Sequence, residues 1–131
     1  CRHNLNYWTF GDYLGIGAGA HAKLTTGGGV IRRWKQKHPA TYVDQLRNGH
    51  AVFQERKLQA TDLSLEFMMN ALRLHAGVPS ATFEERTGLA LSVAQGALDE
   101  ARAKGLMELS EDCLRPTDLG RNYLNDLLGL F

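Results

Sequence analysis

The first eight residues bring together side chains that bind metals and flat ligands. The segment CRHNLNYW contains Cys1, His3, Tyr7 and Trp8. Imidazole nitrogen is a common axial ligand of haem iron, and aromatic rings suit the face of a porphyrin. The segment is therefore a candidate haem site, although a histidine beside aromatic residues more often packs or hydrogen-bonds in an ordinary way.

A second candidate lies between Tyr13 and His21, where glycine occupies every second position from 15 to 19. A glycine inside a helix costs about 1 kcal/mol relative to alanine, so the pattern disfavours a helix. It predicts a strand whose backbone a ligand or another chain approaches closely, or one that simply packs against its neighbours. The run GIGAGA departs from the dinucleotide fingerprint at its sixth position, and no acidic residue follows about twenty positions later.

The run from Arg32 to His38 is basic and contains one aromatic residue, Trp34. Such a run contacts nucleic acid or the propionates of a ligand, or else it is a solvated loop. Among the catalytic motifs, a nucleophile elbow, HExxH, a Walker loop and CxxC are all absent from the sequence.

Two cysteines, Cys1 and Cys113, are too few for a disulfide framework, which favours a reduced, cytoplasmic setting. The sequence contains no run of eighteen apolar residues, so we expect no membrane span. Because the chain begins with Cys1 and not with Met, we expect a piece of a longer protein.

Charge divides the chain near residue 60. Residues 1–60 carry nine Lys/Arg and three Asp/Glu, a net +6, and residues 61–131 carry six against eleven, a net −5. This shift predicts two units of different origin. In the first half the glycine run is followed by a turn over 25–29, a return strand over 30–34, and a short helix over 40–48 that ends near Gly49.

The second half reads as capped helices. Asp62 is the expected cap of a helix that ends at Gly77, Ser80 begins a short helix that Gly88 stops, and Ser92 opens a capping box before a helix that ends at Gly105. Two short strands, 106–109 and 113–115, predict a β-hairpin, and Thr117 caps a last helix. The apolar faces that we expect to be buried are Leu65, Met68, Met69, Leu72 and Ala76 in the first of these helices, Val93, Ala97, Leu98 and Ala101 in the third, and Leu124, Leu127, Leu128 and Phe131 in the last.

This order of helices and hairpin is winged-helix-like, which raises the question of DNA binding. The expected recognition helix offers Asp99 and Glu100 beside Gln95, Arg102 and Lys104. Phosphates would repel a unit of net charge −5, so we expect no nucleic-acid partner.

At HNLNYW (3–8) and GDYLGIGAGAH (11–21) the sequence resembles the radical-SAM coproporphyrinogen III oxidase-like family, specifically its HemW type. Similar motifs continue in LEFMMNALRL (65–74), TGL (87–89) and TDLGR (117–121), so the resemblance covers essentially the whole chain. It implies an α+β, mostly α fold. Residues 1–58 are then the end of a partial radical-SAM α/β barrel, and residues 59–131 are a winged-helix-like C-terminal domain with a small β-hairpin.

The resemblance also implies cofactors and partners. The parent would hold a [4Fe–4S] cluster and S-adenosylmethionine (SAM) on a CxxxCxxC triplet, which this chain lacks, so we expect no metal site and no unaided radical chemistry here. The implied partners are haem or porphyrin, the rest of the parent barrel, and apo-haem-protein clients.

Residue by residue, the HNxxYW motif of the HemW type falls on His3, Asn4, Tyr7 and Trp8, with His3 as the candidate iron ligand. Gly15, Gly17 and His21 correspond to the barrel strand that approaches SAM or the porphyrin. The motif favours a haem chaperone that delivers haem to apo-proteins. An oxygen-independent coproporphyrinogen III oxidase and a winged-helix interaction module stay open as alternatives.

Overall fold

The chain forms two compact units. The computed structural model describes residues 2–50 and 52–131, so Cys1 lies outside the described residues. The helical unit comprises the residues up to Gly11 together with Gln59–Phe131, and the sheet unit comprises Asp12–Leu58. The family resemblance predicts that the first eleven residues belong to the barrel segment, whereas the structure groups residues up to Gly11 with the helical unit. A barrel domain that ends at residue 58 stays a prediction.

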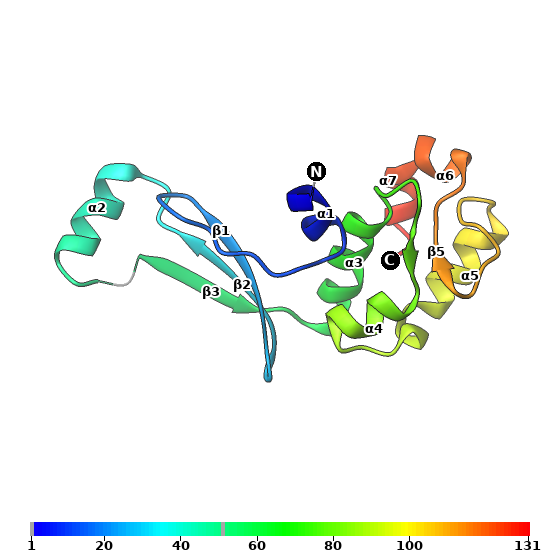
Figure 1. The fold of residues 1–131 in the computed structure, drawn as a ribbon, viewed down its shortest axis with the longest axis horizontal. Helices are drawn as coiled ribbons and strands as arrows, with labels where there is room; N and C mark the ends of the chain where they lie inside the picture. The colour runs from blue at the N-terminus through cyan, green and yellow to red at the C-terminus, as the bar shows by residue number, and fades with distance from the viewer. Residues whose placement is uncertain (1, 51) are drawn as a thin grey trace. The chain divides into compact units, whose positions relative to one another are not determined.

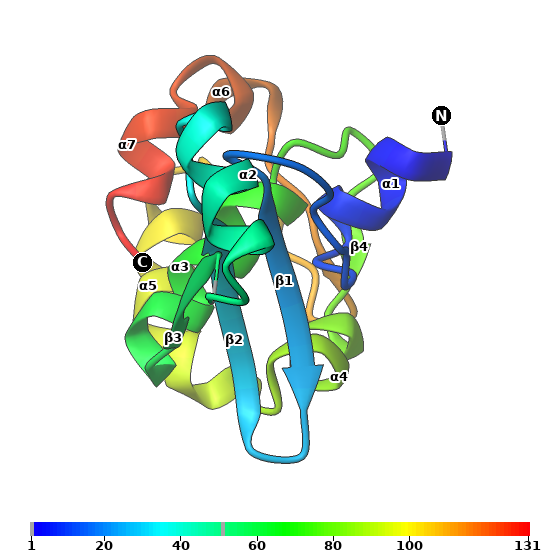
Figure 2. The ribbon, with the colours of Figure 1, turned by 90° about the vertical axis from the view of Figure 1, so that its left-hand side faces the viewer.

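The sheet unit is built on three antiparallel strands, β1 (His21–Thr26), β2 (Gly29–Lys35) and β3 (Phe53–Lys57), in the order β1-β2-β3. Figure 2 shows β1 and β2 running side by side into their tight turn. Thr26 Oγ1 donates to the Gly29 carbonyl at 2.9 Å, and Gly29 has a φ of 117°, which favours glycine. The predicted turn and return strand are confirmed.

One helix, α2 (Pro39–Arg47), connects β2 to β3 in the sheet unit (Figure 1). Pro39 stands at the start, where its missing N–H costs nothing, and Gly49 follows the end with a φ of 70°. This helix is the one predicted over 40–48.

The glycine run is a loop, and the prediction of a strand over 13–21 is wrong. Tyr13 makes an isolated antiparallel bridge to Lys23, and β1 begins only at His21. Gly17 and Gly19 have φ values of 92° and 69°, which fold the chain back and prevent an extended strand.

The helical unit contains α1 (Arg2–Trp8), α3 (Ala60–Ala71), α4 (Ala81–Thr87), a 3-10 turn η1 (Leu91–Ala94), α5 (Gln95–Ala103), α6 (Asp118–Asn122) and α7 (Leu124–Leu128), with β4 (Val78–Pro79) and β5 (Cys113–Leu114) (Figure 1). The short helix that the sequence predicts after Ser80 is α4, and it stops at Gly88, which has a φ of 72°. The helix α1 is not predicted by the sequence pattern.

Three phenylalanines from separate elements form the centre of the helical core. The ring of Phe67 on α3 packs edge-to-face on Phe10 at 5.9 Å and on Phe83 of α4 at 5.1 Å. Because Phe67 must face this core, α3 is rotated from the predicted face. Leu65 and Met69, which were predicted to be buried, are exposed, and the helix ends at Ala71 instead of near Gly77.

The structure differs from the prediction at the hairpin and at residues 91–94. β5 pairs with β4, and the 106–109 segment contributes only the isolated Met107–Pro116 bridge. Residues 91–94 form a 3-10 turn in place of the predicted capping box, and Val93 is exposed.

The Thr117 cap is confirmed, since its hydroxyl accepts from the Gly120 N–H at 3.0 Å. The helix behind it is broken at Tyr123, which has φ −113° and ψ 42°.

The observed fold is a mixed α+β architecture with small antiparallel sheets. This confirms the α+β class, while the barrel end stays a prediction. No helix within residues 2–50 and 52–131 has the length and apolar character needed to cross a membrane.

Candidate functional site

The four residues of the HNxxYW motif lie on one side of α1. His3, Asn4, Tyr7 and Trp8 stand at positions i, i+1, i+4 and i+5 of the helix, a spacing that brings side chains of successive turns together. The His3 and Tyr7 rings meet edge-on, with centroids 4.8 Å apart and an interplanar angle of 74°. His3 and Asn4 are exposed, and Tyr7 and Trp8 are half-buried. The motif therefore presents an accessible imidazole beside aromatic surface.

The end of α1 is fixed by the residues that follow it. The Gly11 N–H donates to the Asn6 carbonyl at 2.7 Å, and a Cβ at Gly11 would collide with the Asn6 side chain. The buried Phe10 adopts a φ of 56° and inserts its ring against Phe67 of α3. A non-glycine residue with positive φ persists where its surroundings hold it, and here the core contact does so. The HNxxYW face is thus carried by a helix that is anchored in a hydrophobic core.

The other predicted site residues belong to the sheet unit. Gly15 packs so closely on the carbonyl oxygen of His21 that a Cβ would collide with it. Gly17 has open space around it, and the side chain of His21 is exposed at the start of β1. Gly15 and His21 are therefore in contact, and Gly17 stands apart on the same loop. The α1 residues belong to the helical unit, so the predicted residues form two separate groups.

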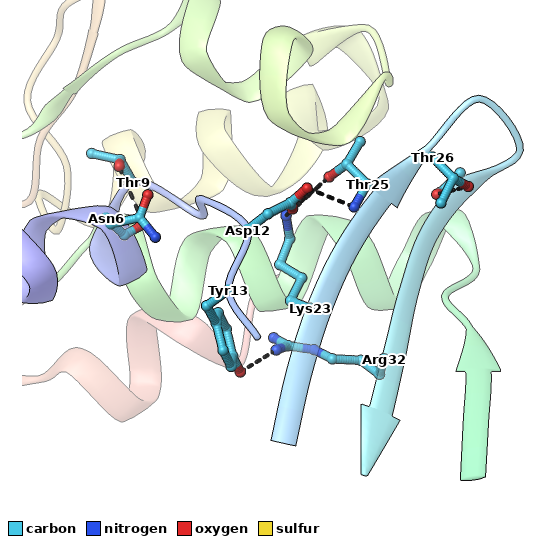
Figure 3. Close-up of polar contacts among 9 residues, drawn as sticks. Asn6, Thr9, Asp12, Tyr13, Lys23, Thr25, Thr26 and Arg32 are labelled. Atoms are coloured by element: carbon cyan, nitrogen blue, oxygen red, sulfur yellow. Dashed lines mark hydrogen bonds and ion pairs between the residues drawn. The ribbon is translucent and has the colours of Figure 1, made fainter. Parts of the chain in front are cut away.

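An ion pair that no sequence motif indicates holds the start of the glycine loop. Lys23 on β1 is only 1% exposed, and its Nζ lies 2.8 Å from Oδ1 of Asp12. The backbone N–H and the hydroxyl of Thr25 each donate to the same carboxylate at 2.8 Å (Figure 3). Burial alone would raise the pKa of Asp12. The hydrogen bonds from Lys23 and Thr25 outweigh that effect and hold the pKa below its ordinary value.

Two arginines of the basic run are held by neighbouring aromatic residues. Arg32 donates to the hydroxyl of Tyr13 at 2.7 Å (Figure 3). Arg33 pairs with Glu55 of β3 at 2.9 Å, and its guanidinium lies 4.1 Å from the centre of the Phe53 ring. The cations of β2 are therefore positioned on the sheet and are not part of a solvated loop.

Metal ligands do not gather in the part of the chain that the structure describes. Cys113 is its free cysteine, with Sγ 3.8 Å from the Ala76 carbonyl, and residues 2–50 and 52–131 hold no group of three or more His, Cys, Asp or Glu side chains arranged to bind a metal.

Comparison with known proteins identifies the class to which this fold belongs. The family model of the HemN C-terminal domain matches residues 58–123, about half of the chain. The chain belongs to this family. Over 92% of its length it also superposes on coproporphyrinogen III oxidase (HemN) from Escherichia coli, a radical SAM enzyme, with a TM-score of 0.60. The two sequences are 19% identical and the match covers 28% of that enzyme, so this likeness shows the fold alone.

Curated relatives place the chain within a branch of the family. It is 42% identical to the heme chaperone HemW of Haemophilus influenzae and to that of Escherichia coli, in each case over 100% of this chain. These matches cover 33% and 34% of the two relatives, so the chain spans about a third of their length. Its sequence is that of part of a HemW-type protein, which confirms the resemblance found from the motifs.

Proposed function

We propose that this chain serves haem binding in a HemW-type chaperone that delivers haem to apo-proteins. The observation that carries the proposal is the side of α1 on which His3, Asn4, Tyr7 and Trp8 lie together, with the His3 imidazole exposed and its ring set against Tyr7. An accessible imidazole is a common axial ligand of haem iron, and the flat aromatic surface next to it suits the porphyrin face.

In this proposal each residue of the motif has a physical role. His3 supplies a neutral ring nitrogen to the iron of the haem cargo, and the edge contact with Tyr7 limits the rotation of the imidazole. Trp8 provides half-buried apolar surface for the porphyrin face, and the Asn4 amide provides polar contacts beside it. The core contact of Phe10 keeps α1 in place while cargo binds and leaves.

The test is haem titration of the chain with a matched control. The variant His3→Ala is compared with His75→Ala, which removes another exposed imidazole of the helical unit. We expect His3→Ala to lose the Soret band of ligated haem, while His75→Ala titrates like the unaltered chain and circular dichroism shows both variants folded. An unchanged Soret band in His3→Ala would remove His3 from the site.

The proposal assigns the [4Fe–4S] cluster and SAM to the part of a HemW-type protein that this chain does not span. Gly15, Gly17 and His21 would then face SAM or porphyrin at the end of the barrel, and the open space at Gly17 and the exposure of His21 support such contact. The barrel, apo-haem-protein clients and the cytoplasmic setting belong to the same proposal.

The other two candidate functions have less support. Coproporphyrinogen III oxidase has the same fold, but the sequences are only 19% identical. This likeness does not support a decarboxylase activity for the chain. An interaction module that binds DNA would have to use α5, whose exposed residues include Asp99 and Glu100.

A further inference from the structure

An open hollow of about 220 Å³ lies in the sheet unit between the glycine loop and β2. Its apolar wall includes Leu14 and Ile16, which are 74% and 92% exposed. Two small side chains, Ala20 and Ala22, leave the space beside them free. Large aliphatic side chains that are exposed next to a hollow form a surface that an apolar ligand can cover.

Two cations line the same hollow. Arg33 and Lys35 are two residues apart on β2, so their side chains lie on one face of the sheet. Glu55 accepts from Nε and Nη2 of Arg33 at 3.2 and 2.9 Å, and Phe53 stacks on the guanidinium. A guanidinium has five N–H donors, so this clamp fixes the group and leaves further donors for a ligand.

The second cation is the less constrained one. Among the residues that the structure describes, Lys35 has no ion-pair partner, and its side chain is half-buried. With Glu55 balancing one of the two cations, the hollow retains a positive charge beside its apolar wall. A ligand that matches both the apolar wall and the cations has an apolar body with carboxylates at its edge.

We propose that this hollow binds the propionate-bearing edge of a porphyrin, with Arg33 and Lys35 on the carboxylates and the ring over Leu14 and Ile16. The inference rests on the proposed function for the identity of the ligand, but it concerns other residues and another unit than the HNxxYW face. A volume of 220 Å³ is below the roughly 300–1,000 Å³ of pockets that enclose a whole ligand, so the hollow holds one edge of the macrocycle.

The experiment uses metal-free protoporphyrin IX, because His3 has no iron to ligate in that probe. Its affinity for the 131-residue chain is measured by fluorescence for Lys35→Gln, Arg33→Gln and the control Lys57→Gln, an exposed cation of β3 outside the hollow. We expect each of the first two variants to bind about threefold to tenfold more weakly, as for the loss of one partly exposed charge-assisted contact. The control variant should bind like the unaltered chain, and the dimethyl ester of the porphyrin should bind more weakly than the free acid.

The outcomes separate this site from the α1 face. If His3→Ala loses ligated haem but keeps its affinity for protoporphyrin IX, while Lys35→Gln weakens that affinity, both proposals are supported. If His3→Ala leaves haem binding unchanged while Lys35→Gln weakens porphyrin binding, the α1 assignment fails and the hollow stands. Equal affinity of Lys35→Gln and the unaltered chain, or of the ester and the free acid, overturns the proposal. Arg33→Gln removes the ion pair with Glu55 and can therefore unfold the sheet. Lys35 holds no ion pair among the described residues, so we expect Lys35→Gln to stay folded and to test the hollow by itself.

Discussion

Asp12 is the residue that ties the glycine loop to the sheet. Its carboxylate accepts three hydrogen bonds, from the Lys23 ammonium and from the N–H and hydroxyl of Thr25. Lys23 is almost wholly buried, so the pair satisfies a cation that has no access to water. The loop residues that follow Asp12 line the hollow. The contacts of Asp12 with Lys23 and Thr25 therefore fix the position of the first residue of this loop.

We predict that Asp12→Asn destabilises the chain by about 1–3 kcal/mol. Breaking a buried ion pair costs roughly 3–5 kcal/mol, and the value is reduced here because the Asp12 side chain is 43% exposed. The measurement is the free energy of unfolding in urea at pH 7. The control Asp44→Asn, an exposed carboxylate of α2, should change it by less than about 0.5 kcal/mol. Equal stability of the two variants would contradict the role given to Asp12.

The lowered pKa of Asp12 gives this effect a pH dependence. A carboxylate whose folded pKa lies below the unfolded value contributes stability that is fully present above that unfolded value, here the ordinary 3.8. The contribution is lost as the pH falls through the folded pKa. The difference between the unaltered chain and Asp12→Asn should therefore shrink when unfolding is followed from pH 7 to below pH 4. A difference that stays constant over this range would be inconsistent with the ion pair.

At the scale of elements, predictions succeeded where a short-range signal decides the structure. Gly49, Gly88 and Gly105 end helices with φ values near 70°, and Thr117 caps α6, all within a few residues of sequence. The buried face of α3 depends on a contact with Phe10, which is far away in the sequence. The period of apolar residues within α3 therefore predicts the wrong buried face. The helix α1 was missed because most of its side chains are exposed and the sequence shows no apolar stripe.

Two glycines of the helical unit should respond to alanine in opposite ways. A Cβ at Gly120 on α6 would collide with the Leu106 carbonyl oxygen, and backbone cannot move aside as a flexible side chain does. We expect Gly120→Ala to lower the free energy of unfolding by about 2–3 kcal/mol. Gly96 on α5 has nothing within 4 Å of such a Cβ, so Gly96→Ala should raise it by about 0.5 kcal/mol. Thermal melts read out both changes, and a stable Gly120→Ala variant would show that α6 lies farther from Leu106.

At the scale of the whole molecule, the family was recognisable from linear motifs, while the arrangement of the site was not. HNxxYW is a run in sequence, and the helical spacing that brings His3 to Tyr7 follows once α1 is known. The hollow depends on a loop that folds back at Gly17 and Gly19. The alternating glycines of this loop are a pattern that predicts a strand, so the sequence does not indicate the hollow. Glu55, which pairs with Arg33, lies on β3 22 residues later in the sequence, and no local pattern indicates this contact.

We predict that the chain alone assembles no iron–sulfur cluster and cleaves no SAM. A [4Fe–4S] centre of the radical-SAM kind needs clustered thiolates, and the sequence has two cysteines at opposite ends. Anaerobic reconstitution followed by iron and sulfide analysis should give the same low content for the unaltered chain and for Cys113→Ser. Iron and sulfide at cluster stoichiometry in the unaltered chain would contradict the prediction.

The division into two units predicts the order of proteolysis. In the helical unit, Phe67, Met68 and Ala71 of α3 are wholly buried, and such packed backbone is cut only after the unit opens. The sheet unit exposes its Gly27–Gly28 turn and the end of α2, where Arg47 is a trypsin site. We expect limiting trypsin to cut first within 12–58, and a fragment that contains 65–131 to persist with helical circular dichroism. Mass spectrometry of the early fragments identifies the sites, and early cleavage at Arg73 would show that the helical unit lacks the independent core described here.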